Sequence, residues 1–194
     1  MLTPGEVSRA LFGVWRLARL DAGGFAWFDT SLQGVRRSFQ VAYLVAPIYL
    51  MESVLAFPEH ATLANVVRFA ILRVLAYVIL WTAWPVLLFE LARILGCGTH
   101  YARYLVAYNW FRMVEASFLI PVILLQRLPF VPGTTVETVI LALTVLLIVY
   151  NWFIARVGLG LTGTAAFAMV VIDLLLSEII DITAASLIRM PSVH

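Results

Sequence analysis

Charged residues are scarce in this chain, and lysine is absent from it. All 13 basic residues are arginines, and charged residues make up 12% of the 194 positions, whereas soluble proteins average about 25%. The net charge of +2 is too small to predict a nucleic-acid partner. A chain with so few charges has little polar surface to present to water.

Residues that bind metals are also few. Cys97 is the one cysteine, which excludes an intrachain disulfide and a cysteine cluster for metal. His60, His100 and His194 fall in separate loops and the tail, with no two at metal-ligand spacing. No compact Ser/His/Asp or Cys/His arrangement stands out. We therefore expect no metal, no cofactor and no catalytic site.

Apolar residues fill the chain instead, at 63% of positions and with a mean hydropathy of +0.98. They form five stretches, each about as long as the roughly 20 residues that a helix needs to cross a bilayer. Stretches of this length predict helices and not barrel strands. The fold class is therefore an all-α, polytopic membrane bundle, with spans near residues 38–57, 66–91, 101–125, 136–154 and 162–183.

The segment before the first span has a different pattern. Thr3-Pro4-Gly5-Glu6 has the form of a capping box with proline at the first helical position, and it predicts a helix to about residue 20. Its apolar residues share one side and its arginines the other. We interpret residues 1–37 as a cytoplasmic amphipathic segment on the bilayer surface and 38–194 as the transmembrane domain. The residues expected to bind the membrane surface are Arg9, Trp15, Arg16 and Arg19.

The arginines near the span ends predict the orientation. If the five spans alternate, one side carries Arg9, Arg16, Arg19, Arg36, Arg37, Arg93, Arg103 and Arg156. The other side carries Arg68, Arg127 and Arg189. By the positive-inside rule the N-terminus is cytoplasmic and the C-terminus is on the opposite side. We expect a bacterial inner-membrane protein with a periplasmic C-terminus.

Charged residues inside the spans are the main functional candidates, because such residues usually face a bundle interior or a water-filled cavity. Counting at about 1.5 Å per residue sorts them into two sets by depth. The midplane set is Arg112, Glu115 and Asp173, and the outer set is Glu52, Arg73 and Glu178. They are interpreted as ion pairs that fix helix register, as a substrate or proton path, or as a seam for a partner.

Two patterns accompany these charges. Asp173, Ser177 and Asp181 recur at four-residue spacing, which predicts a polar stripe that faces protein. Tyr108-Asn109-Trp-Phe recurs as Tyr150-Asn151-Trp-Phe, which we interpret as coincidence among aromatic-rich spans, since the two copies lie at different depths.

Two other motifs are discounted. The 158–163 stretch matches GxGxxG, but that motif needs a strand and a βαβ unit to bind a dinucleotide, and here it links two membrane helices. Arg36-Arg37 is interpreted as a juxtamembrane orientation signal and not as a twin-arginine export signal.

From the second span onward the chain resembles the Yip (Ypt-interacting protein) family of five-span membrane proteins, in its divergent bacterial form. The resemblance rests on Gly96-Cys-Gly-Thr-His-Tyr-Ala-Arg-Tyr-Leu-Val-Ala-Tyr, on Ile120-Pro121-Val-Ile-Leu-Leu, and on Trp152-Phe-Ile-Ala-Arg-Val-Gly-Leu-Gly. It covers roughly residues 66–185 and implies a five-helix bundle with a cytoplasmic N-terminus. Eukaryotic relatives imply trafficking and small-GTPase partners, but no GTPase-binding segment is recognisable here.

Two functions of different kinds follow. The leading hypothesis is a non-enzymatic membrane-organising or partner-binding protein, a scaffold or accessory subunit, that associates with the bilayer and with itself or another membrane protein through small-residue helix seams. The alternative is a small transporter or channel subunit with a polar path past Arg112, Asp173 and Glu178. A lipid-active enzyme is a third possibility.

Overall fold

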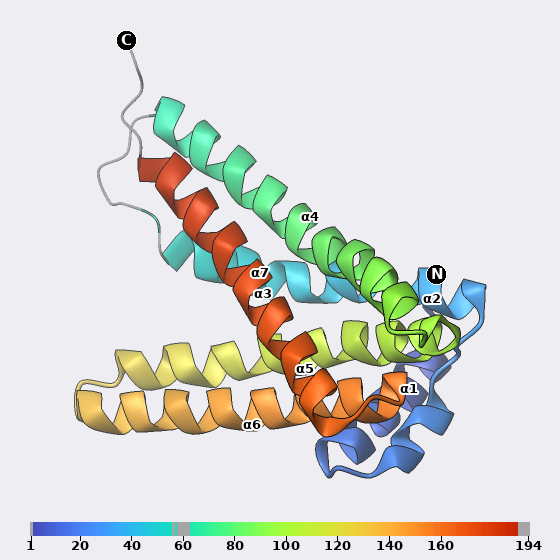
Figure 1. Cartoon of the computed structure of the whole chain (residues 1–194). Helices are drawn as coiled ribbons and strands as arrows, with labels where there is room; N and C mark the ends of the chain where they lie inside the picture. Colours follow the sequence, from blue (N-terminus) through green and yellow to red (C-terminus); the bar gives the residue numbers. More distant parts are fainter. Residues whose placement is uncertain (1, 56, 58–62, 190–194) are drawn as a thin grey trace.

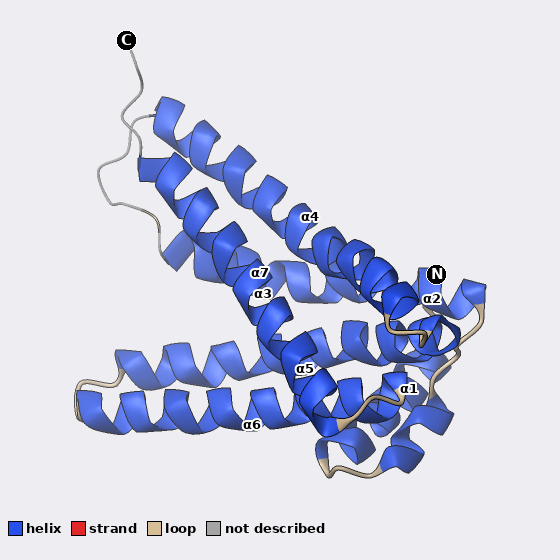
Figure 2. Cartoon of the chain, in the orientation of Figure 1, coloured by secondary structure: helices blue, strands red, loops and turns tan. Residues whose placement is uncertain are grey.

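The computed structural model of the chain describes residues 2–55, 57 and 63–189. Within these ranges the chain is helical and contains no strand (Figure 2), which confirms the all-α class. The helices in chain order are α1 (Pro4–Ala18), the 3-10 helix η1 (Ala22–Trp27), α2 (Leu32–Ser38), α3 (Val41–Leu55), α4 (Leu63–Ile94), the 3-10 helix η2 (Gly98–His100), α5 (Tyr101–Arg127), α6 (Gly133–Leu159) and α7 (Gly163–Arg189).

Four helical segments are long and apolar enough to cross a membrane. They are Leu32–Leu55, Asn65–Ile94, Gly98–Arg127 and Gly133–Leu159. These segments contain or closely overlap the first four predicted spans, and they support the assignment to membrane proteins. The fifth predicted span falls on α7, which is not one of the four.

Successive long helices run in opposite directions between the same two ends of the molecule (Figure 1). One end, called here the N-terminal end of the bundle, holds α1, η1, α2 and the turns at residues 95–100 and 160–162. The α5–α6 hairpin and the antiparallel pair of α4 and α7 meet near this end and diverge away from it. Helix α3 packs against α5. Away from the N-terminal end of the bundle, few residues of the long helices are buried.

Local sequence signals account for several helix ends. Thr3 and Glu6 form the predicted capping box at the start of α1, with Pro4 in its first turn. Gly160 ends α6 in the left-handed conformation, with φ of 70°, which a residue without a Cβ adopts at little cost. The glycine-rich 158–163 stretch therefore ends one helix and begins the next.

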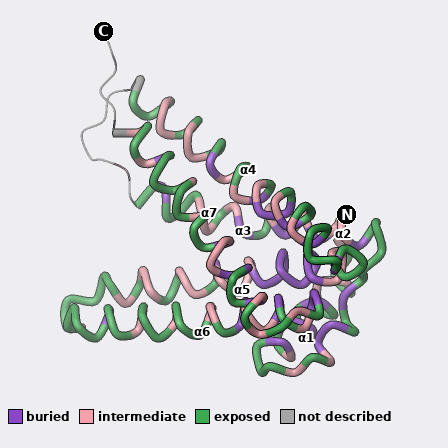
Figure 3. The backbone as a smooth tube through the Cα atoms, in the orientation of Figure 1, coloured by how far each residue is buried: buried purple, intermediate pink, exposed green. Residues whose placement is uncertain are grey.

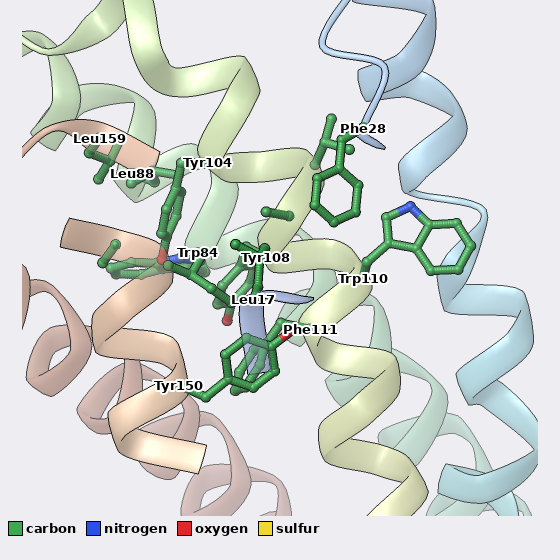
Figure 4. Packing of buried hydrophobic residues seen from close by; sticks show 14 of the residues in the cluster. Leu17, Phe28, Trp84, Leu88, Tyr104, Tyr108, Trp110, Phe111, Tyr150 and Leu159 are labelled. Atoms are coloured by element: carbon green, nitrogen blue, oxygen red, sulfur yellow. The ribbon is translucent and has the colours of Figure 1, made fainter. Parts of the chain in front are cut away.

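Buried side chains concentrate at the N-terminal end of the bundle (Figure 3). Aromatic rings make up much of this core (Figure 4). Tyr108 stacks on Tyr104 at 5.7 Å between ring centroids and lies 6.1 Å from the ring of Trp84. Such ring pairs contribute stabilisation beyond the area that they bury. The tightly packed half of the molecule is thus the half that carries the N-terminal segment.

The N-terminal segment packs onto the bundle. Val14 and Leu17 of α1 are buried in the core. A Cβ built on Gly13 would lie 2.9 Å from the carbonyl oxygen of Gly24, so the absence of a side chain allows α1 and η1 to approach closely. The Tyr150 hydroxyl donates a hydrogen bond to the Val14 carbonyl at 2.8 Å. Helix α1 therefore makes direct contacts with the long helices of the bundle.

Candidate functional site

The most buried charged side chain among the described residues is Asp173, in the first half of α7, with 4% of its surface exposed. Its carboxylate accepts a hydrogen bond from the Tyr108 hydroxyl of α5 at 2.8 Å and another from the Asn151 amide of α6 at 3.1 Å. A buried charge requires such partners, because an unpaired one is expensive in a low-dielectric environment. Three helices thus converge on one carboxylate.

Arg112 was predicted to lie with Asp173 and Glu115, and it forms its ion pair with Glu115. Its guanidinium donates to the Glu115 carboxylate at 2.9 Å, one turn along the same helix. Arg112 still lies within electrostatic range of Asp173. The structure therefore brings the predicted midplane set together, but the residues in contact with Asp173 are Tyr108 and Asn151.

The partners of Asp173 come from two Tyr-Asn pairs, Tyr108-Asn109 and Tyr150-Asn151. In each pair, one residue binds Asp173 and the other binds α1 or α2. Tyr108 and Asn151 contact the carboxylate, whereas Asn109 donates to the hydroxyl of Ser38 in α2 at 2.9 Å and Tyr150 donates to the backbone of α1. The recurrence is a sequence pattern that contains all four residues, but it does not indicate either kind of contact.

A cavity of about 700 Å³ lies among α3, α4, α5, α6 and α7. This volume is within the range of about 300–1,000 Å³ that is usual for small-molecule sites. Its apolar wall comes mainly from α5 and α6, and includes Phe118, Leu119, Val122, Ile140, Leu143 and Leu147. Helices α3 and α4 add the aromatic residues Tyr49, Tyr77 and Trp81. The cavity occupies the part of the bundle where the helix pairs diverge.

Five charged side chains line this cavity: Glu52, Arg73, Arg112, Glu115 and Asp181. Four of the five helices around the cavity contribute them. Charged groups within apolar spans are expensive and usually mark a ligand, an ion path or a proton path. The cavity is therefore the strongest candidate for a functional site in the part of the chain that the structure describes.

Arg73 differs from Arg112 in its pairing. No carboxylate oxygen of a described residue lies within 4 Å of its guanidinium nitrogens, and its Nε is buried without a hydrogen-bond partner. Glu52 and Asp181 are both within electrostatic range of it. These three groups line one cavity from three different helices without closing into an ion pair.

The outer set was predicted with Glu178, and the structure puts Asp181 in that place. Both carboxylates are exposed, but Asp181 lines the cavity and Glu178 does not. Three residues along a helix correspond to a rotation of about 300°, which leaves the two side chains about 60° apart, with Asp181 on the side of α7 nearer the cavity. Asp181 continues the predicted stripe of Asp173 and Ser177, of which Ser177 also lines the cavity. This stripe connects the buried carboxylate to the cavity along α7.

The residues predicted to bind the membrane surface lie on and just after α1. Trp15 is 49% exposed, its ring lies 5.7 Å from that of Phe12, and the Arg19 guanidinium covers it at 3.7 Å. Arg9 is exposed and donates to a backbone carbonyl in its own helix. This end of α1 therefore presents aromatic and basic groups together.

Arg16 is arranged differently, because it pairs with Asp21 at 2.6 Å. The pKa of the Asp21 carboxyl is lowered, first by the backbone N–H of Gly23 and then by Arg16. The pair closes the turn between α1 and η1 and neutralises the arginine.

Comparison with known protein families, with characterised proteins and with solved structures finds no match to this chain. The resemblance to the Yip family stays a prediction from the sequence. Within the described ranges no group of three or more His, Cys, Asp or Glu residues has metal-binding geometry. His60 and His194 lie outside the described residues. The cavity and the buried Asp173 are therefore the features of the described structure that point to a function.

Proposed function

We propose that the protein is a five-span integral membrane carrier in which the charged cavity is the substrate site. The observation that carries this proposal is the five charged side chains that line a cavity between apolar helices. Of the two functions considered from the sequence, the transporter gives these charges a role. A purely structural role predicts closed ion pairs, and Arg73 has none among the described residues.

The proposal includes α7 as the fifth span. Helix α7 has 27 residues and packs against α4 and α6. Of its acidic residues, Asp173 is buried in the core and Asp181 lines the cavity. Apolar residues between them in the sequence, such as Leu175 and Ile179, are exposed. This distribution suits a helix that faces protein on one side and lipid on the other.

The proposed orientation is the one that the arginines predict, with the N-terminal end of the bundle at the cytoplasmic face of a bacterial inner membrane. Phe12, Trp15 and Arg19 then lie at the bilayer surface, where aromatic and basic side chains are favoured. The cavity lies toward the other face, and the tightly packed core separates it from the cytoplasm. This arrangement corresponds to one state of an alternating-access carrier.

Accessibility from each side of the membrane tests the proposal without knowledge of the substrate. In a Cys97→Ser background, Ser177→Cys places a thiol in the cavity, and Ile179→Cys places one on the 61%-exposed outer side of the same helix. A charged, membrane-impermeant thiol reagent is added to either side of proteoliposomes. A carrier predicts that Cys at 177 reacts from both sides in turn, while Cys at 179 reacts from neither because lipid surrounds it.

The alternative functions give different results. Reaction at 177 from one side only means a fixed pocket, which supports a partner-binding protein and overturns the carrier. Absence of reaction at 177 from both sides means that the charges form a dry structural cluster. Equal reaction at 177 and 179 means that α7 does not face lipid, and this overturns the five-span arrangement.

A further inference from the structure

Three charged groups line the part of the cavity that is far from the N-terminal end of the bundle, called here the distal part. They do not form an ion pair with one another. Arg73 supplies one positive charge from α4, and Glu52 and Asp181 supply negative charges from α3 and α7. Direct ion pairs are absent among these described residues, although each carboxylate is within electrostatic range of the guanidinium. No acceptor in the described part of the chain reaches the buried Nε of Arg73. A ligand with charges of both signs would provide the missing partners.

The depth of these groups limits how a ligand reaches them. Arg73 lies ten residues from the distal end of α4 and Asp181 eight residues from the distal end of α7, which correspond to about 12–15 Å along the helices. A ligand charge must therefore enter well below the helix ends. The cavity residues from α5 and α6 are mainly apolar, with Phe118, Val122 and Leu143 among them, and the two charged residues there, Arg112 and Glu115, pair with each other.

We propose that the cavity binds a zwitterionic phospholipid, whose phosphate meets Arg73 and whose ammonium group meets Glu52 and Asp181 while an acyl chain lies along α5 and α6. This proposal rests on the proposed function and names its substrate class. Guanidinium groups bind phosphates through paired, charge-assisted hydrogen bonds, and an ammonium group donates readily to carboxylates.

Other ligand classes fit the same groups less well. An anionic lipid would bring its phosphate toward two carboxylates without a positive group for them. A cationic amphiphile would leave Arg73 unpaired and would be repelled by it. A small soluble zwitterion would satisfy the charges but would leave the apolar wall of α5 and α6 in contact with water, which is unfavourable by about 25 cal/mol for each Å². The combination of both charge signs with an apolar wall therefore favours a lipid.

Native mass spectrometry of the delipidated full-length protein measures this preference. The probes are phosphatidylethanolamine, phosphatidylglycerol and free phosphoethanolamine, which share a phosphate but differ in the ammonium group or in the acyl chains. We expect phosphatidylethanolamine to bind most tightly. Arg73→Gln is expected to weaken its binding about 10- to 100-fold, since one charge-assisted contact is lost.

The double variant Glu52→Gln/Asp181→Asn gives the sharpest readout. It removes both carboxylates and keeps Arg73, so we expect its preference to reverse toward phosphatidylglycerol. A residue that matters only for folding would lower the affinity for both lipids together. Glu178→Gln is the matched control, because it neutralises an exposed carboxylate on the same helix that does not line the cavity, and it is expected to leave the preference unchanged.

Three results would overturn the lipid proposal. If free phosphoethanolamine binds as tightly as phosphatidylethanolamine, the ligand is a soluble zwitterion and not a lipid. Equal binding of the two lipids, unaffected by the variants, would mean adventitious association with the outer apolar surface. If Glu178→Gln reverses the preference between the two lipids, the head group does not bind at Arg73, Glu52 and Asp181. In each case two-sided accessibility at position 177 still decides separately whether the protein is a carrier.

Discussion

Removal of the Tyr108 hydroxyl tests the role of the buried aspartate directly. Tyr108→Phe keeps the aromatic ring, which packs 6.1 Å from the ring of Trp84 and 5.7 Å from that of Tyr104. It removes the donor at 2.8 Å from the Asp173 carboxylate. Because both residues are buried, with 4% of each exposed, water does not readily replace the lost hydrogen bond.

The expected loss of stability follows from two reference values. Hydrogen bonds to charged groups contribute about 1.5–3 kcal/mol in proteins, whereas hydrogen bonds between membrane helices average about 0.6 kcal/mol and reach about 1.7 kcal/mol. Asp173 retains one donor, Asn151, after the substitution. We therefore expect Tyr108→Phe to lower the free energy of unfolding by about 1–2 kcal/mol.

Unfolding in mixed micelles with increasing SDS, followed by circular dichroism, measures this change. Tyr43→Phe is the control, because Tyr43 is 79% exposed, and exposed substitutions change stability by less than about 0.5 kcal/mol. In an Asp173→Leu background, Tyr108→Phe should lose most of its effect, since the acceptor is gone. The reasoning is refuted if Tyr108→Phe and Tyr43→Phe have the same stability, or if the effect persists without Asp173.

Two further predictions concern the same core and the N-terminal segment. Asp173→Asn should be tolerated far better than Asp173→Leu in the same unfolding assay, because a reoriented Asn151 can offer its unpartnered Oδ1 to the new amide; equal losses would contradict this. At acidic pH the ion pairs that hold α1 to α2 within the N-terminal segment should be lost, and α1 should become less protected. The pKa of Glu6 is lowered by hydrogen bonds from Thr3 and by Arg37, and that of Asp29 by Ser31 and Arg37. Their stabilisation is complete above about pH 4–5 and is lost as the pH falls through the lowered values, since Arg37 then loses its partners at 2.8 Å and 2.6 Å. Hydrogen exchange of α1 amides, corrected for the intrinsic rate, should increase over this range while α5 remains protected; unchanged protection of α1 would contradict the prediction.

The sequence was sufficient for the helical class, for the positions of four spans and for the Arg112–Glu115 contact, because these depend on composition and on spacing within one helix. It was not sufficient for contacts between helices. Counting residues along the helices placed Asp173 and Arg112 at the same depth. The rotation of α7 about its own axis, which the count does not give, determines which neighbour each side chain faces. The same rotation excluded Glu178 from the cavity and introduced Asp181.

The Tyr-Asn pairs show what was missed and why. The two pairs do not indicate a duplicated unit, since they lie at different depths in their helices. Their importance lies in two contacts per pair, one to Asp173 and one to α1 or α2. Nothing in a single sequence indicates that a tyrosine hydroxyl 136 residues away binds the backbone of α1.

That contact also determines the order in which the molecule can be assembled. Helix α1 is synthesised before α5 and α6, but the Tyr150 hydroxyl that binds it belongs to α6, and the Asn109 amide that binds Ser38 of α2 belongs to α5. Both hydrogen bonds can therefore form only after these later helices have been synthesised. Helix α1 is thus made before the helices that fix its final position.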